Sequence, residues 1–275
     1  MLRRLLERLA LLRYNELFLY DATEMTESVR QNAGVTAVRD EAIVRYAAMK
    51  GVEIKEIGEA ELAELRREGV IEVATEAARS LAGRLETMRE RMAGACASGA
   101  KRFLVTDFSD GYDWHSPIVS LPGIVMGGYY ALVGAKAAKM DLEREVSQFL
   151  DAPLAGTLLR LGTLYLRGGA YRERESEYFN ILAGDCGYSR HPGITDFVLE
   201  EVSTILRGIM KESERYLPRS ETAQEILYTA LLMDAACHRR SEARLKTIKE
   251  ELVKMWNRHF ECAGRDTAAA KLPRF

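Results

Sequence analysis

The sequence lacks an excess of either charge. Its 275 residues include 39 lysines and arginines and 41 aspartates and glutamates, which gives a formal net charge of −2 at pH 7. A protein whose main partner is DNA or RNA needs surplus basic residues to neutralise phosphates, so we expect no nucleic acid as a partner. The 47% hydrophobic and 29% charged residues are instead typical of a soluble globular protein.

Cysteine is also scarce. The four cysteines, Cys96, Cys186, Cys237 and Cys262, lie far apart and form no CxxC pair. Secreted disulfide scaffolds are denser in cysteine, so we interpret these residues as reduced thiols and expect a cytoplasmic protein. No Cys or His pair with metal-ligand spacing is matched by a second pair, and no glycine-rich phosphate loop occurs. We therefore expect neither a metal nor a cofactor.

One uncharged run, at residues 116–135, is long enough to cross a bilayer. Its two prolines and four glycines do not suit a helix that must satisfy every backbone group within lipid, so we expect no membrane span. At the amino end, charges interrupt the apolar residues of MLRRLLERLALL, which does not fit a signal peptide. The leucines of this segment share one helical face, and we favour a helix packed on the core over a helix lying on a membrane.

The first half of the sequence alternates short apolar segments with helical patterns. Strands are predicted at residues 15–21, 52–57, 70–74 and 101–107, and helices at 38–50, 59–68 and 84–97. Strands separated by helices are typical of parallel βα units. Beyond about residue 140 only helices are predicted, at 141–151, 153–167, 194–216, 221–237 and 240–260. The pattern indicates an α/β domain at 1–139 and a helical subdomain at 140–275.

The densest polar and aromatic cluster is TDFSDGYDWHS at residues 106–116, directly after the most apolar predicted strand. In parallel α/β folds, functional groups gather where strands end. The side chains that interest us here are Asp107, Phe108, Asp110, Tyr112, Asp113, Trp114 and His115. Carboxylates beside flat aromatic faces suit a sugar, whose hydroxyl groups surround an apolar ring face.

Two other interpretations of this cluster remain open. The first is a capped turn, in which Asp110 and Gly111 make the bend and Trp114 packs inward. The second is a Mg²⁺ or Ca²⁺ site, because aspartates supply the oxygen ligands that these ions prefer. The segment lacks the glycine placement and the terminal glutamate of a calcium-binding loop, however.

Residues 80–114 resemble the last helix and last strand of the barrel in family 20-like glycoside hydrolases, the relatives of β-N-acetylhexosaminidases. The shared features are a Ser-Leu-x-Gly-Arg opening, a Gly-Ala pair, an apolar strand and a Thr-Asp-aromatic run. Weaker similarity covers residues 12–20, 117–135, 161–166 and 256–264. The resemblance implies a sugar-facing strand end. Asp107, Phe108 and Asp110 would contact the sugar ring and its hydroxyl groups there, with Phe108 standing where the family usually has Trp.

The sequence departs from the family in its middle part. A complete barrel needs eight strands in about 250 residues, whereas four are predicted here. The resemblance therefore implies a partial or shortened (β/α) TIM-like barrel, followed by an all-helical C-terminal subdomain. The family's adjacent Asp-Glu pair, in which Glu is the general acid, is not found. The only Asp-Glu neighbours, Asp40 and Glu41, fall in a predicted helix and are interpreted as solvated charges.

Three functions are compatible with these observations. The first is hydrolysis of N-acetylhexosaminides, with Asp107 or Asp110 as candidate catalytic carboxylates in a rearranged site. The second is a catalytically silent protein that binds a carbohydrate, either a hexose or an N-acetylhexosamine, or acts as a scaffold. The third is a half barrel completed by a second copy as a homo-oligomer, because an uncovered sheet edge invites pairing.

Overall fold

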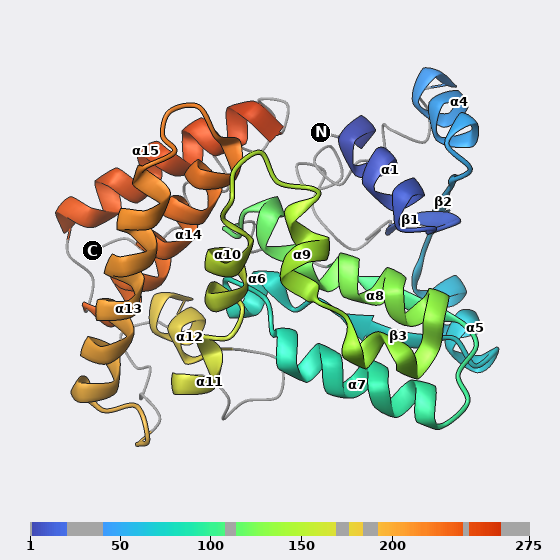
Figure 1. Ribbon diagram of the computed structural model, residues 1–275, viewed down its shortest axis with the longest axis horizontal. Coiled ribbons are helices and arrows are strands. Elements are labelled where there is room, and N and C mark those ends of the chain that lie inside the picture. Colours follow the sequence, from blue (N-terminus) through green and yellow to red (C-terminus); the bar gives the residue numbers. More distant parts are fainter. Residues whose placement is uncertain are drawn as a thin grey trace.

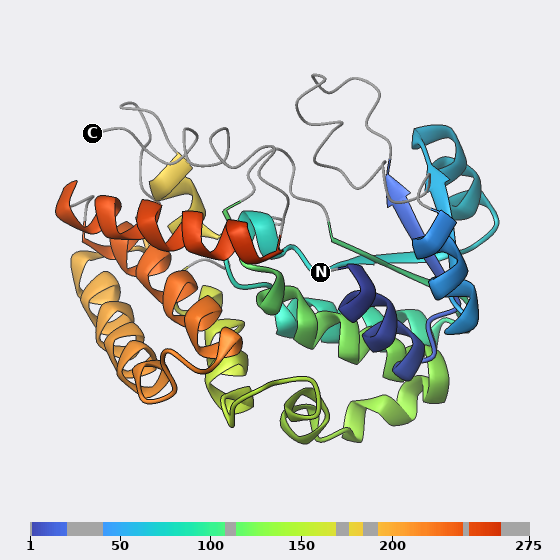
Figure 2. The same ribbon diagram turned by 90° about the horizontal axis from the view of Figure 1, so that it is seen from above.

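The computed structural model describes residues 2–20, 41–107, 114–168, 176–183, 192–238 and 242–259. Helices dominate these residues, and the strands form two short pairs (Figure 1). Strand β1 (Glu16–Tyr20) pairs in parallel with β2 (Glu53–Ile57), and β3 (Ile71–Ala74) pairs in parallel with β4 (Phe103–Thr106). The strand-bearing end and the helices nearest the carboxyl terminus lie at opposite ends of the molecule (Figure 2).

The first strand pair has its own small core. Helix α1 (Leu2–Leu11) packs near α4 (Glu41–Met49), and α5 (Glu59–Arg67) follows β2. Leu6 and Leu9 of α1 are buried with Ala47 and Val52, which confirms the predicted core-facing side of the first helix. Burial of such an apolar stripe is what stabilises a short helix in a protein.

The second strand pair lies against the main core. The short helix α6 (Ala77–Ser80) and the longer α7 (Leu85–Ala97) connect β3 to β4. Beyond β4, the 3₁₀ turn η1 (Pro117–Ser120) leads into α8 (Leu121–Val133) and the 3₁₀ turn η2 (Gly134–Lys139). Helix α8 packs on both α7 and β4, and α7 packs on β3, so these two helices and the second strand pair share one core.

The stretch Pro117–Lys139 is long and apolar enough to cross a membrane, with a mean hydropathy of 1.6. Within the protein, 61% of its most apolar window is buried against other elements. The buried core helix of a soluble protein has the same length and composition, so this stretch is weak evidence for a membrane span.

In the described residues beyond η2 the structure has the helices α9 (Leu142–Ser147), α10 (Ala155–Leu161), α11 (Tyr165–Gly168), α12 (Glu177–Ala183), α13 (Asp196–Glu214), α14 (Glu221–Cys237) and α15 (Glu242–His259). Helix α14 is buried along most of its length, because α12, α13, α15 and η1 all pack against it. The main core is continuous from Leu12 to Met255, on both sides of residue 140.

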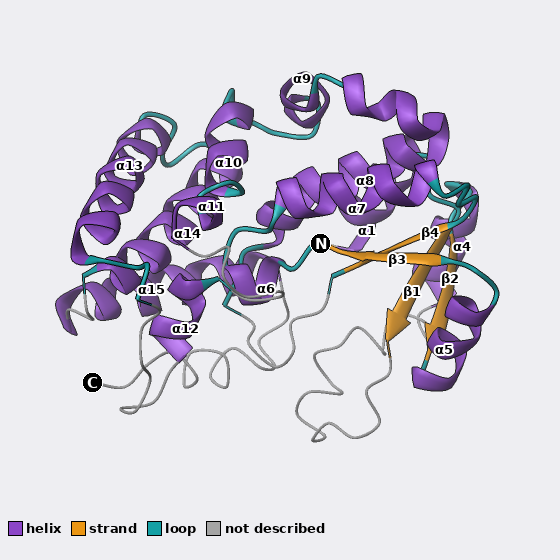
Figure 3. Ribbon diagram, turned by 90° about the horizontal axis from the view of Figure 1, so that it is seen from below, coloured by secondary structure: helices purple, strands orange, loops and turns teal. Residues whose placement is uncertain are grey.

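The predicted barrel is wrong for the part of the chain that the structure describes. All four predicted strands are present within a residue or two of their expected bounds, and they are parallel. However, no hydrogen-bonded ladder joins one described pair to the other, and Figure 3 shows the pairs running in different directions. A barrel needs every strand to pair on both sides, whereas here α4 and α5 pack on β2, α7 packs on β3 and α8 packs on β4.

Replacing two glycines on neighbouring helices by alanine is expected to change the free energy of unfolding in opposite directions. A Cβ atom at Gly127 of α8 would overlap the Val105 side chain and lie 2.7 Å from the Tyr14 hydroxyl, whereas one at Gly94 of α7 would meet nothing within 4 Å. We expect Gly127→Ala to lower the free energy of unfolding by about 1–3 kcal/mol. Gly94→Ala is expected to raise it by up to about 1 kcal/mol. Urea denaturation of both variants checks the close helix–strand packing, and equal effects would contradict it.

Candidate functional site

Strands β3 and β4 end side by side at one edge of their sheet. The Thr75 amide donates to the Thr106 carbonyl oxygen at 2.9 Å, which continues the ladder for one more residue. The Thr75 hydroxyl donates to Oδ1 of Asp107. Thr75 is buried and Asp107 is exposed. A buried hydroxyl thus fixes a carboxylate that faces solvent, and Oδ2 of Asp107 accepts no hydrogen bond from any described residue.

The turn after β3 is held in an uncommon backbone conformation. Glu76 and Leu81 have φ angles of +55° and +69°, in the left-handed region that side chains other than glycine seldom occupy. Each such residue costs of the order of 1 kcal/mol or more and persists only where its surroundings hold it. Because such strain clusters at functional sites, we take the edge formed by Thr75, Glu76 and Asp107 as the candidate functional site.

An ion-pair cluster beneath the edge holds this turn. The Glu76 side chain is only 6% exposed; Oε2 lies 3.3 Å from Nη1 of Arg84, and Oε1 lies 2.9 Å from Nη1 of Arg91. The buried Arg84 guanidinium also lies 4.9 Å from the ring centroid of Tyr165. Arg91 is 36% exposed. With Asp107 the cluster contains two carboxylates and two guanidinium groups, so its formal charges cancel.

The chain that returns from the edge is anchored to the helical region. The Trp114 indole is 1% exposed and packs on Phe179, with ring centroids 5.8 Å apart. The Tyr228 hydroxyl donates to the Trp114 carbonyl oxygen at 2.6 Å. Burial raises the pKa of Tyr228, so the phenol stays protonated and keeps this donor at neutral pH. Oε2 of Glu225 accepts from the Ser116 hydroxyl at 2.8 Å and from the Ile118 amide at 2.9 Å.

The residues singled out from the sequence therefore fall into four groups. Asp107 lies exposed at the strand end, as a solvent-facing acceptor requires. Trp114 is in the core, in the inward position of the capped-turn interpretation, and His115 is half-buried. Residues outside the described part of the chain are Phe108, Asp110, Gly111, Tyr112, Asp113 and Asp40. Glu41 is an exposed residue in the first turn of α4 and pairs with Arg45 of the same helix.

Thr75, Glu76 and Arg84 are site residues that the sequence analysis missed. Thr75 and Glu76 directly follow a correctly predicted strand, so they carry the same local signal as Asp107, a polar residue at a strand end. Arg84 is the last residue of the Ser-Leu-x-Gly-Arg motif. The sequence held no signal that Arg84, eight positions after Glu76, would pair with it, or that Thr75 would bond to Asp107, 32 positions away.

A second polar cluster joins α13 to α14 and superficially has the composition of a hydrolase triad. The Ser203 hydroxyl donates to Oδ1 of Asp234 at 2.6 Å and lies 2.7 Å from Nε2 of His238. In a catalytic triad the serine proton goes to His, and Asp orients the other ring nitrogen. Here Nε2 also faces Asp234, at 3.3 Å, and Ser203 is fully buried. The cluster is therefore a buried link between helices, without an accessible nucleophile.

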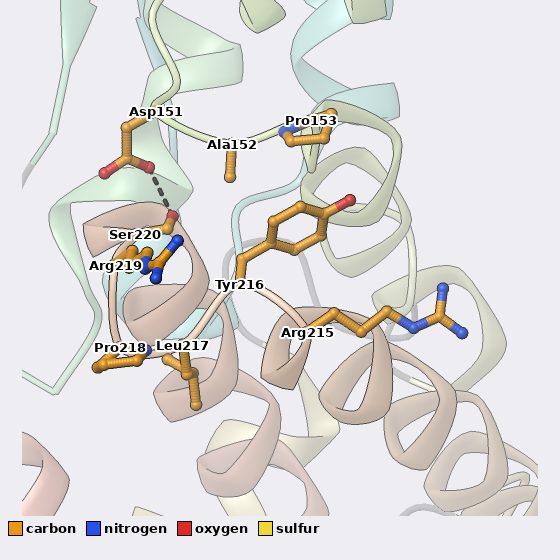
Figure 4. Close-up of a pocket in the computed structure, with 9 residues that line it drawn as sticks. All are labelled: Asp151, Ala152, Pro153, Arg215, Tyr216, Leu217, Pro218, Arg219 and Ser220. Atoms are coloured by element: carbon orange, nitrogen blue, oxygen red, sulfur yellow. Dashed lines mark hydrogen bonds between the residues drawn. The ribbon is translucent and has the colours of Figure 1, made fainter.

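The described residues also line a cavity of about 400 Å³ between the 151–153 segment and the turn from α13 to α14. In Figure 4 the Tyr216 ring stands in its middle, with Arg219 on one side and Arg215 extending away on the other. Asp151 closes one end and caps α14, because its carboxylate accepts from the Ser220 hydroxyl at 2.6 Å and from the Glu221 amide at 2.7 Å. Two arginines, Arg215 and Arg219, and one carboxylate, that of Asp151, are the charged groups of this lining.

The Asp151 cap predicts a pH dependence of stability. Partial burial acts to raise the pKa of Asp151, but hydrogen bonds from Ser220, Thr222 and the Glu221 amide outweigh it and hold the pKa below its usual value. A depressed pKa stabilises the fold fully above the unfolded value of about 3.9, and this contribution is lost as pH falls through the folded value. We expect the stability difference between the protein and Asp151→Asn to shrink below about pH 4. Urea denaturation at a series of pH values measures it, and a difference that grows on acidification contradicts the cap.

No group of three or more His, Cys, Asp or Glu side chains in the described part of the chain is arranged to hold a metal ion. In comparisons with known proteins, no family model, no curated protein and no solved structure matches the chain. The resemblance to family 20-like glycoside hydrolases therefore rests on the residues quoted for it, and it stays a prediction.

Proposed function

We propose that the protein binds a carbohydrate, either a hexose or an N-acetylhexosamine, at the shared carboxyl edge of β3 and β4. The observation that carries the proposal is the Asp107 carboxylate, fixed by the buried Thr75 hydroxyl and exposed to solvent. An ionised carboxylate only accepts hydrogen bonds, and sugar hydroxyl groups donate them. With Oδ1 occupied by Thr75, Oδ2 is the oxygen that a hydroxyl group would approach.

The charges around Asp107 favour an uncharged ligand. Glu76 and Asp107 carry two negative charges and Arg84 and Arg91 two positive ones, so the formal charges at the edge cancel. The aromatic residues Phe108 and Tyr112 follow Asp107 in the sequence, and the resemblance to family 20-like hydrolases implies the same class of ligand. Carboxylate oxygens, aromatic faces and balanced charge together suit a neutral polyol.

Binding is favoured over hydrolysis. Glycoside hydrolysis needs two carboxyl groups flanking one bond, or one together with the acetamide of the substrate. Glu76, next in the chain to Thr75, is buried and paired with two guanidinium groups, so it is poorly placed to donate a proton to a leaving group. Asp107 is then the one described carboxylate at this edge that faces solvent.

Titration calorimetry with a panel of hexoses and N-acetylhexosamines tests the proposal. We expect Asp107→Asn to weaken binding at least about tenfold, because hydrogen bonds to a charged acceptor contribute about 1.5–3 kcal/mol. Thr75→Val keeps the Asp107 carboxylate but removes the hydroxyl group that holds it. We expect it to weaken binding less than Asp107→Asn does.

Glu68→Gln is the matched control. Glu68 is an exposed carboxylate paired with Arg102 at the opposite, amino-terminal edge of the same strand pair. We expect its binding to equal that of the unmodified protein. Asp107→Asn titrating like Glu68→Gln would overturn the proposal, and release of free sugar from an oligosaccharide would show that the site also hydrolyses.

A further inference from the structure

We infer that the cavity between the 151–153 segment and the turn from α13 to α14 binds a small organic anion. Its anionic group lies at Arg219 and its apolar body lies against Tyr216. The cavity volume of about 400 Å³ is within the range typical of small-molecule pockets. The described residues that line it, 151–153 and 215–220, include none of the residues of the β3–β4 edge. The inference therefore does not rest on the proposed sugar site.

The two arginines of the cavity are exposed and unpaired. Neither the Arg215 nor the Arg219 guanidinium group has a hydrogen-bond or ion-pair partner among the described residues. Other arginines on or beside α13 are paired with carboxylates: Arg207 with Glu200, Arg160 with Glu212 and Arg167 with Glu201. A guanidinium group presents its donors in a planar fork that fits a carboxylate or a phosphate group. The donors of Arg215 and Arg219 are therefore available to an anion from solution.

The carboxylate in the described lining does not neutralise these arginines. Oδ1 of Asp151 accepts from the Ser220 hydroxyl at 2.6 Å and from the Thr222 amide at 3.2 Å, and Oδ2 accepts from the Glu221 amide at 2.7 Å. In Figure 4 the carboxylate accordingly points at Ser220. Both of its oxygens are thus occupied by the start of α14. Two positive groups and one negative group leave a surplus positive charge on the lining, which favours an anion.

The remaining side chains give the cavity an apolar wall. They are Ala152, Pro153, Tyr216, Leu217 and Pro218. In Figure 4 the Tyr216 ring stands between Ala152 and Pro153 on one side and Leu217 on the other. The ring is half-buried and offers a flat face on which a second ring can stack. An inorganic ion would leave this wall uncovered, so the lining favours an anionic group attached to an apolar body.

NMR titration with phenyl phosphate and phenylacetate tests the inference, because each probe joins one anionic group to one aromatic ring. We expect both probes to shift the amide resonances of Tyr216, Leu217 and Arg219, with dissociation constants of the order of 1 mM for ligands of this size. The tighter of the two identifies the anionic group that the site prefers. Inorganic phosphate and the uncharged benzyl alcohol should each bind at least about fivefold more weakly. Equal binding of either one, or no shift with either anion, would overturn the inference.

Two variants separate the anionic contact from the apolar one. Arg219→Gln should weaken binding of both anions at least about fivefold, because it removes a charged donor. Tyr216→Leu should weaken phenyl phosphate but leave inorganic phosphate unchanged, because it removes the ring and no charge. Thermal melts of both variants check that they fold.

Arg207→Gln is the matched control. Arg207 is also an exposed arginine of α13, but it pairs with Glu200 and does not line the cavity. It removes the same charge as Arg219→Gln, and we expect it to leave phenyl phosphate binding unchanged. Equal weakening by the two variants would show that only net charge attracts the anion, and this would overturn the site.

Discussion

Replacing Glu76 by Ala is expected to lower the free energy of unfolding by about 3–5 kcal/mol, the usual cost of removing one partner from a buried ion pair. The carboxylate is shared by Arg84 and Arg91, and its removal leaves the buried Arg84 guanidinium without the charge that faces it at 3.3 Å. The same change frees the left-handed turn at residue 76 from its main side-chain contacts. Urea denaturation followed by circular dichroism measures the loss.

Two further variants separate charge from packing at this position. Glu86→Ala breaks a half-exposed ion pair with Arg89 on α7, and we expect a change within about 0.5 kcal/mol. The double variant Glu76→Met with Arg84→Met replaces the buried pair by apolar side chains and should be much less harmful than Glu76→Ala. A loss below about 1 kcal/mol for Glu76→Ala would show that the cluster does not hold the turn.

Trp114→Ala should also lower the free energy of unfolding by about 3–5 kcal/mol, the range for removing a large aromatic side chain from a core. The indole is 1% exposed and contacts Phe179, and the residue joins the strand end to α12 and α14. Trp114→Phe keeps a ring in the same place and should cost less. Thermal melts of the two variants, compared with the unmodified protein, give the ranking.

The Trp114→Ala variant also tests whether the indole lies in the core or forms the surface of a sugar site. A platform that stacks on a sugar from the solvent side would lose binding in Trp114→Ala with little change in stability. The structure places the indole in the core, so we expect the stability loss first. Trp114→Ala with an unchanged melting midpoint would contradict the core position.

The secondary structure followed from local patterns in the sequence. The apolar run near Glu16–Tyr20 and the periodic Leu, Ile and aromatic residues of α13 and α14 act over a few residues, and these elements lie where they predict. The barrel failed because strand pairing is decided by contacts between distant residues. Strands β2 and β3 are consecutive in the chain, yet they do not pair. No local pattern in either strand indicates this.

The candidate site was predictable to the same extent. Asp107 was found because a polar residue after an apolar strand is a local signal. The Thr75 hydroxyl that fixes it lies 32 residues away, and Glu225 is 109 residues from Ser116. Such partners depend on how α7 and α14 pack, which no motif near Asp107 encodes. The position of Trp114 could not be predicted from local sequence either, because an aromatic residue beside carboxylates fits both a sugar site and a core.

The most direct test of sugar binding at Asp107 is a thermal melt with and without each sugar of the panel. A ligand that binds only the folded state adds about 2.7 kcal/mol at 100 times its dissociation constant, enough to raise the midpoint by roughly 5–10 °C. We expect such a rise with at least one hexose or N-acetylhexosamine, and we expect it to be lost in Asp107→Asn. A cooperative transition whose midpoint is the same with every sugar would contradict it.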